Sequence, residues 1–181
     1  SLPPTAPHLG GSWVQQLAAG LRKTGSTLRA ELTAADATAP ELLEKLLFAA
    51  RQLAADDKAA PATRAAAIES LALSELDTER ALLASLLDGR QAQQVQSAAL
   101  ACLARFDGPE VGEIVLARWQ GYSPTVRAQA TELLFARPER LQVLLSGIEA
   151  GRVRPQDLEP ARIKALREHK TAAIQDQAAK L

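Results

Sequence analysis

Several residue types that carry chemistry are scarce in this chain of 181 residues, which has no methionine, one cysteine, two histidines and 3% aromatic residues. A single cysteine cannot form a disulfide within the chain. The histidines, His8 and His169, lie 161 positions apart (169 − 8) and have no partners at metal-ligand spacing. No run approaches the ~20 apolar residues that a membrane-spanning helix requires. We therefore predict no metal, no cofactor and no membrane span, and the missing methionine leads us to expect a piece of a longer protein.

The charge is balanced, because Lys plus Arg and Asp plus Glu both number 21 and the formal net charge is zero. Affinity for nucleic acid depends mainly on clustered Lys and Arg that release counterions from phosphates. No such cluster dominates this sequence. We predict that the chain binds no nucleic acid.

The few remaining reactive residues form no catalytic constellation. Cys102 lies at helical spacing from Ala99, Leu103 and Phe106, which favours a packed small side chain over a reactive thiol. The segment Gly10-Gly11-Ser12 lacks the lysine and the preceding strand of a phosphate-binding loop. No general acid and base can be paired from spacing alone. We predict that the chain is not an enzyme and has no catalytic or cofactor-binding residue.

Four segments have nearly the same sequence pattern: a branched residue, a long polar residue and then alanines and leucines at helical spacing. Aligned on the long polar residue, they step by 32, 31 and 48 residues (96 − 64, 127 − 96, 175 − 127). A period of about 20 to 50 residues is typical of stacked helical repeats. The four segments are Thr63–Leu71, Val95–Leu103, Val126–Leu134 and Ile174–Leu181.

The pattern predicts an all-α fold, since no segment alternates apolar and polar residues and the prolines fall at boundaries of apolar runs. Tetratricopeptide repeats have a similar period but depend on aromatic residues that are scarce here. We therefore expect an α-solenoid of HEAT-like repeats, a right-handed superhelix of about ten helices. Arg64 and Arg127 recur at one repeat position, where we expect each to bridge to carboxylates or carbonyls of the adjacent repeat.

The prolines and glycines of residues 1–11 predict a flexible linker, followed by a repeat domain over 12–181. The first expected helix carries Trp13, Leu17, Leu21, Leu28 and Leu32, with Gly25 as its weak point. The next begins at a capping box, Thr38 to Glu41, and buries Leu42, Leu46, Ala50 and Leu53. Ser123-Pro124 predicts a later helix start, with proline at the first helical position.

Two surface features are candidate protein-interaction sites. Trp119 and Tyr122 flank a turn at Gly121, and aromatic residues on a surface poor in them can anchor a partner. The alternative is that Trp119 closes the core between neighbouring repeats. Arg152 and Arg154 belong to a basic group, with Arg162, Lys164 and Arg167, that could meet an acidic surface or form a solvated face interleaved with acids.

Three strings resemble a known protein group: 86–91 leading to Val95-Gln96, 119–127, and 148–153 followed by Asp157-Leu158. From about Leu42 to Leu181 the sequence is similar to the HEAT-repeat middle region of large bacterial haem-binding proteins. These combine a sugar-dehydrogenase-like β-propeller, HEAT repeats and a C-terminal c-type cytochrome domain. The haem-attachment sequence Cys-x-x-Cys-His is absent from this chain, so no haem is expected here.

The resemblance implies a periplasmic or exported parent protein acting in redox chemistry. This chain would be its non-catalytic helical scaffold or spacer, with the β-propeller domain, the cytochrome domain or another protein as partner. The alternative is a HEAT-like enzyme or ligand-binding module, resembling the alkyl-purine DNA glycosylases or the bilin lyases. The glycosylase would need a basic groove and the lyase a pigment pocket, and neither is visible in a neutral sequence poor in aromatic residues.

Overall fold

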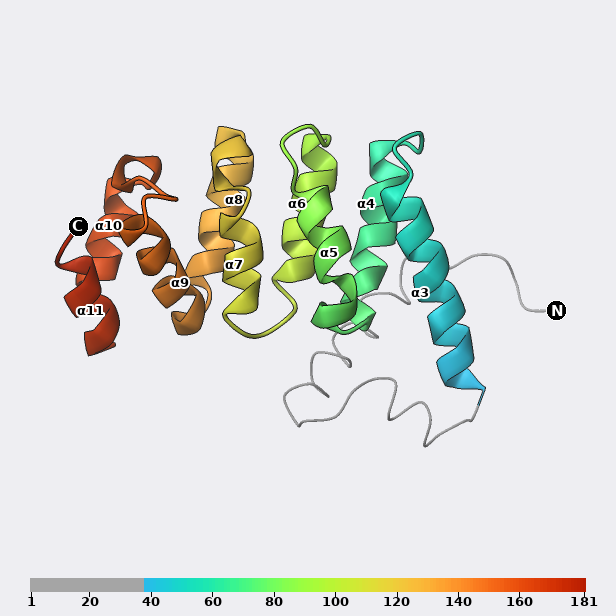
Figure 1. Cartoon of the computed structure of the whole chain (residues 1–181), viewed down its shortest axis with the longest axis horizontal. Coiled ribbons are helices and arrows are strands. Elements are labelled where there is room, and N and C mark those ends of the chain that lie inside the picture. The colour runs from blue at the N-terminus through green and yellow to red at the C-terminus, as the bar shows by residue number, and fades with distance from the viewer. Residues whose placement is uncertain (1–37) are drawn as a thin grey trace.

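The structure of the chain is a computed structural model, and it describes residues 38–181. Over this range the secondary structure consists of α-helices and three short 3-10 helices, without any strand (Figure 1). The predicted all-α fold is confirmed for these residues. The expected linker over 1–11 and the expected helix from Trp13 to Leu32 lie outside the described residues.

The helices follow one another with short connections, and the longest connection, between α9 and α10, contains a 3-10 helix. In chain order the elements are α3 (Ala39–Ala55), α4 (Pro61–Ser70), η1 (Leu71–Leu73), α5 (Leu76–Leu86), α6 (Gln93–Leu103), α7 (Glu110–Leu116), η2 (Trp119–Gly121), α8 (Pro124–Phe135), α9 (Pro138–Glu149), η3 (Pro155–Asp157), α10 (Pro160–Arg167) and α11 (Ala172–Ala178).

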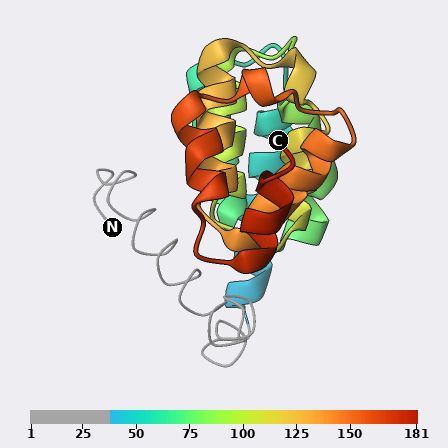
Figure 2. The ribbon, with the colours of Figure 1, turned by 90° about the vertical axis from the view of Figure 1, so that its left-hand side faces the viewer.

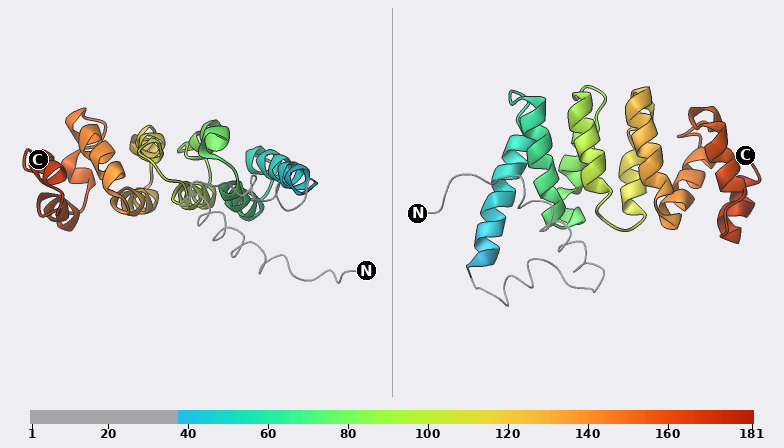
Figure 3. Two further views of the ribbon diagram at one scale, coloured as in Figure 1. Left: turned by 90° about the horizontal axis from the view of Figure 1, so that it is seen from below. Right: turned by 180° about the vertical axis from the view of Figure 1, so that it is seen from behind.

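The helices form a row in which each packs mainly on helices one or two places away in the chain. Helices α4, α6 and α8 lie on one side of the row, and α3, α5, α7, α9 and α11 lie on the other (Figure 3). The view along the row shows the two sides facing each other (Figure 2), and the buried residues of both sides belong to one hydrophobic core. This arrangement leaves the inter-helix turns along two opposite edges of the molecule.

Proline and glycine fix several helix boundaries. Helices α3, α4, α8, α9 and α10 each have proline in the first two helical positions, where its missing N–H costs nothing. Ser123 caps α8 as predicted, since its hydroxyl accepts a hydrogen bond from the Val126 amide at 3.3 Å. Gly151 has a φ of +71° directly after α9, the left-handed conformation that glycine favours.

Glycine also lets α7 and α9 approach closely. A Cβ added at Gly112 would lie 3.1 Å from Val143, and one added at Gly147 would lie 2.6 Å from Leu116. The two glycines are on different helices, so each helix offers a flat place to a branched or long side chain of the other. This close contact brings the C-terminal ends of α7 and α9 together at one edge of the molecule.

The predicted buried face is correct for α6, whereas in α3 only Ala50 of the four predicted residues is buried. In α3 the buried residues are Leu43, Leu47, Ala50 and Ala54, whereas Leu42, Leu46 and Leu53 are exposed. Both sets have steps of three, four or seven, so spacing alone could not separate two neighbouring stripes of an apolar helix. The expected capping box at Thr38 is also corrected, since its side chain makes no capping hydrogen bond to α3.

Candidate functional site

The predicted interaction residues lie along one edge of the row, which we call the loop edge and define as residues 117–123 and 150–159. The first segment joins α7 to α8, and the second joins α9 to α10. Gln120 links them, because its amide nitrogen donates to the Arg152 carbonyl at 2.8 Å. The close packing of α7 on α9 therefore places two sequence-distant loops side by side.

The two aromatic residues of the loop edge are buried. Trp119 is 1% exposed and Tyr122 is 4% exposed, and their rings make an edge-on contact with centroids 6.2 Å apart. The Tyr122 hydroxyl donates to the Val115 carbonyl at 2.8 Å, and burial raises the pKa of this phenol. The expectation of an aromatic surface anchor is therefore corrected, and the alternative holds: both rings pack inside, where they gain more from apolar burial than from exposure.

Asp157 is the polar centre beside the Trp119 ring. Its side chain is 4% exposed and accepts hydrogen bonds from Trp119 Nε1 at 3.4 Å and from the Arg154 guanidinium at 2.9 Å and backbone amide at 3.2 Å. Arg127 Nη1 approaches the same carboxylate at 3.7 Å and lies over the Trp119 ring. The Arg154 guanidinium is the main reason that the pKa of Asp157 lies below its usual value.

The predicted arginines Arg152 and Arg154 reach solvent from the loop edge, with side chains 38% and 58% exposed. Both are already in ion pairs. Arg152 binds Glu113 of α7 at 2.7 Å, and Arg154 binds Asp157. The structure thus brings all four predicted residues to one edge, but only the arginines are accessible to a partner.

Arg118 is an exposed member of the loop edge that the sequence reasoning missed. Within residues 38–181 its guanidinium forms no hydrogen bond and no ion pair, although its charge acts on Asp88. It lies between two shallow hollows, one shared with Arg64 and Arg90 and the other with Arg152. Its place before Trp119 in the predicted turn was the only available signal, and a lone arginine in a turn is too common to single out.

The turns of successive helix pairs also touch directly at the loop edge. A Cβ added to Gly89, in the turn between α5 and α6, would lie 2.7 Å from the Gly121 carbonyl oxygen. Gly89 does not have a positive φ, so its role is close backbone approach and not a left-handed turn. Two glycines from strings 86–91 and 119–127 thus meet in space.

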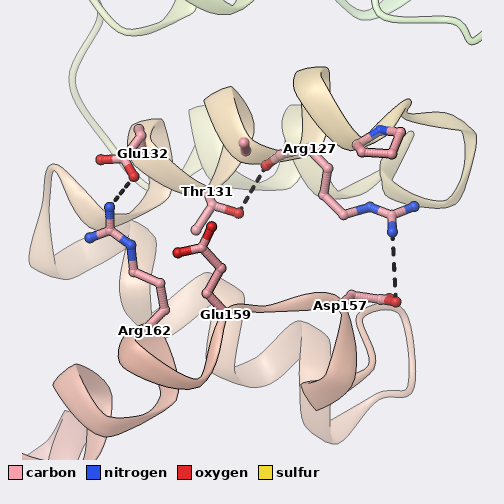
Figure 4. Close-up of a pocket in the computed structure, with 8 residues that line it drawn as sticks. Arg127, Thr131, Glu132, Asp157, Glu159 and Arg162 are labelled. Carbon is pink, nitrogen blue, oxygen red and sulfur yellow. Dashed lines mark hydrogen bonds and ion pairs between the residues drawn. The ribbon is translucent and has the colours of Figure 1, made fainter.

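A hollow of about 220 Å³ lies between α8 and the loop before α10 (Figure 4). Arg127 and Arg162 line it together with Glu132, Asp157 and Glu159. Arg162 is paired with Glu132, and Arg127 is paired with Asp157, so both cations have carboxylate partners within the protein (Figure 4). The volume is below the ~300 Å³ usual for small-molecule sites. The ion pairs in this lining therefore neutralise charges between α8 and the segment that contains η3 and α10.

The recurring polar position binds backbone carbonyls, but the predicted bridge to the adjacent repeat is found for Arg127 and not for Arg64, whose partners Ala54 and Asp57 lie within its own helix pair. Arg64 Nε donates to the Ala54 carbonyl at 2.9 Å, and Gln96 Nε2 donates to the Asp88 carbonyl at 2.8 Å. Arg127 donates to the Tyr122 carbonyl at 3.3 Å. In each case the long side chain binds a carbonyl at or just after the end of a preceding helix, where free carbonyls need donors. Gln175, the fourth member of the alignment, is exposed.

Residues 38–181 contain no group of three or more His, Cys, Asp or Glu side chains that could hold a metal ion. Over the same residues, no helix combines the length and the apolar character needed to cross a bilayer. His169 lies just after α10, where its Nδ1 accepts a hydrogen bond from the Thr171 amide at 3.1 Å. No protein-family model, no curated protein and no solved structure matches the chain.

Proposed function

We propose that this chain is a HEAT-like α-solenoid that serves as a non-catalytic scaffold or spacer within a larger redox protein of the periplasm or cell exterior. The proposal joins two lines of argument: the repeat wording of the sequence, with its resemblance to haem-binding proteins, and the row of helices. The observation that supports it is the packing of each helix mainly on near neighbours, because such an array can hold its two ends apart.

The loop edge is the proposed docking surface. Arg118, Arg152 and Arg154 all present guanidinium groups to solvent there, and Arg118 is in no ion pair among the described residues. The buried Asp157 carboxylate pairs with Arg127 and Arg154 and accepts from the Arg154 amide, which holds the backbone of this loop. A rigid row of guanidinium groups suits carboxylates, which it can bind through paired hydrogen bonds. The proposed partner surface is therefore acidic.

The experiment measures binding of the chain to the c-type cytochrome and β-propeller domains that the proposal places in the parent protein. Arg118→Glu and Arg152→Glu should each weaken binding to one of these domains by about tenfold, with the affinity falling as salt rises. Arg80→Glu is the matched control, because Arg80 is exposed near the start of α5, away from the loop edge. It should leave the affinity unchanged.

Two results would count against the proposal in different ways. A parent sequence without a downstream Cys-x-x-Cys-His would remove the redox context. Equal effects of Arg152→Glu and Arg80→Glu would reject the loop edge as the docking surface while leaving the spacer role open to other faces.

A further inference from the structure

Two adjoining hollows lie across the turns of successive helix pairs at one edge of the molecule. The first, of about 740 Å³, lies between the α3–α4 turn and the α5–α6 turn, and the second, of about 450 Å³, lies between the α5–α6 turn and the α7–α8 turn. Asp88 and Arg118 line both hollows, so the two adjoin. We call them together the arginine groove. The turns that form it lie along the upper edge of the row in Figure 1.

Each of three successive inter-helix connections contributes one arginine to the arginine groove. Arg90 belongs to the α5–α6 turn, Arg118 to the α7–α8 turn and Arg152 to the loop between α9 and α10. The side chain of Arg90 is 91% exposed, that of Arg152 is 38% exposed, and Arg118 is exposed. The groove therefore carries one accessible guanidinium group for each of three helix pairs.

The lining of the arginine groove has more positive than negative groups. It includes four guanidinium groups and two carboxylates, which leaves an excess of two positive charges (4 − 2). These groups belong to Arg64, Arg90, Arg118 and Arg152 and to Asp57 and Asp88. Arg118 is in no ion pair among the described residues, and Glu113, the partner of Arg152, is not part of the lining. Charge complementarity therefore favours an acidic ligand.

We propose that the arginine groove binds an extended acidic peptide segment of the partner, with one carboxylate for each helix pair. This inference rests on the proposed docking role of the loop edge and names the element of the partner that docks there. Helices α4, α6 and α8 pack on one another in order. Packed helices lie about 8–10 Å apart, so the turns that carry the arginines recur at about this interval.

The geometry of an extended chain sets the spacing of the acidic residues. A polyproline-type chain has three residues per turn and rises about 3.1 Å per residue. Side chains three residues apart therefore point the same way and are separated by about 9 Å, which matches the interval between the turns. The predicted ligand has an aspartate or glutamate at every third position. Each carboxylate can then form paired hydrogen bonds with one guanidinium group.

Two features of the lining favour a peptide over a nucleic acid. Asp57 and Asp88 lie among the arginines, and they would repel a continuous run of phosphates more than carboxylates placed at intervals. Gly89 and Gly121 line the second hollow or its edge, where the absence of side chains leaves room for the backbone of a peptide. The arginine groove thus combines separate cations with open backbone between them.

Binding of two synthetic peptides of equal composition to the full chain tests the proposal. In one peptide each aspartate is followed by two prolines, and in the other the same aspartates are consecutive. The first should bind about tenfold more tightly in fluorescence anisotropy, with an affinity that falls as salt rises. Arg90→Glu and Arg118→Glu should each weaken this binding by about fivefold or more. Arg80→Glu, an exposed change on α5 outside the groove, should leave it unchanged.

Equal affinities for the two peptides, or binding that Arg118→Glu leaves unchanged, would overturn the proposal. A single-stranded oligonucleotide that binds more tightly than the spaced peptide at the same salt would overturn it too and would point to phosphates. Binding of the partner domains that depends on Arg118 and Arg152, without selectivity for peptide spacing, would keep the proposed docking surface and reject only the peptide. Selective peptide binding without binding of either domain would support the arginine groove and reject the proposed partner domains.

Discussion

Two turns of this molecule use the same repeat position in different ways. After α3, Arg64 binds within its own helix pair, to the Ala54 carbonyl and, at 3.2 Å, to Asp57. After α7, Arg127 binds the Tyr122 carbonyl but also reaches Asp157, which belongs to the loop after the next helix. The contacts of Arg64 therefore stay within one helix pair, whereas the contacts of Arg127 connect two successive helix pairs.

The length of a neighbouring loop accounts for this difference. The connection between α3 and α4 is short, and Asp57, the acid in it that Arg64 binds, is 79% exposed. The connection between α9 and α10 is longer, folds back over the end of α7, and supplies a carboxylate that is 4% exposed. A stretched repeat step can therefore add a polar link between helix pairs. The predictions below separate this linked region from the simple turn.

The largest difference is expected for two aromatic residues. Trp119→Ala should lower the free energy of unfolding by about 3–5 kcal/mol, because it empties a buried site beside Tyr122 and Asp157. Phe48→Ala should cost less than about 1 kcal/mol, since Phe48 is 58% exposed on α3. Urea unfolding followed by circular dichroism measures both. Similar losses would mean that the linked region is no better packed than the surface of α3.

The next difference concerns the two carboxylates. Asp157→Asn should destabilise the protein by about 1.5–3 kcal/mol, because buried hydrogen bonds to a charged group are lost. Asp57→Asn should cost no more than about 0.5 kcal/mol, as an exposed ion pair contributes little. Equal costs in urea titrations would contradict the distinction between a buried link and an exposed pair.

The contribution of Asp157 should also depend on pH. Its pKa is lowered in the folded state, mainly by Arg154, so its stabilisation is fully present above the unfolded pKa of about 3.9 and is lost as pH falls through the lower folded value. The stability difference between the wild type and Asp157→Asn should therefore be constant from pH 7 to pH 5 and shrink below pH 4. A difference that grows on acidification would have the wrong sign for this account.

The smallest difference is expected between two glutamines of the repeat position. Gln96→Ala should cost about 0.5–1.5 kcal/mol, because its buried amide donates to the Asp88 and Leu87 carbonyls at 2.8 and 3.4 Å. Gln175→Ala should be nearly neutral, since Gln175 is exposed. Thermal unfolding of the two variants under one condition suffices. A larger loss for Gln175 would show that the alignment misplaces the position.

The helices and much of the core were predictable because the sequence is locally consistent. Val95, Ala99, Cys102, Leu103 and Phe106 follow a helical stripe, and all five are buried. Helix α8 starts at Ser123-Pro124 because the hydroxyl and the ring each satisfy the helix start by local chemistry. Features that depend on residues close together in the chain could thus be predicted from the sequence.

The candidate site was predictable only in part, because its geometry depends on contacts between distant segments. The cluster of Trp119, Tyr122, Arg152 and Arg154 could be proposed, but whether the rings face inward depends on the loop that lies over them. The role of Asp157 likewise requires residues from α8 and η2 that are 30 and 38 positions away (157 − 127, 157 − 119). The predicted buried face of α3 was wrong for the same reason: two faces of this helix have apolar residues at similar spacing, and packing against α4 decides which one is buried.

The most direct test of the link between helix pairs is native-state hydrogen exchange of the wild type and Asp157→Asn. The account predicts that amides of 118–122 and 152–158 exchange about tenfold faster in the variant, because local opening there loses at least ~1.4 kcal/mol of resistance. Amides of α4 and α6 should keep their wild-type rates, as no contact of Asp157 reaches them. Uniform acceleration throughout the chain, or unchanged rates in both loop segments, would contradict the claim that Asp157 ties the two pairs together.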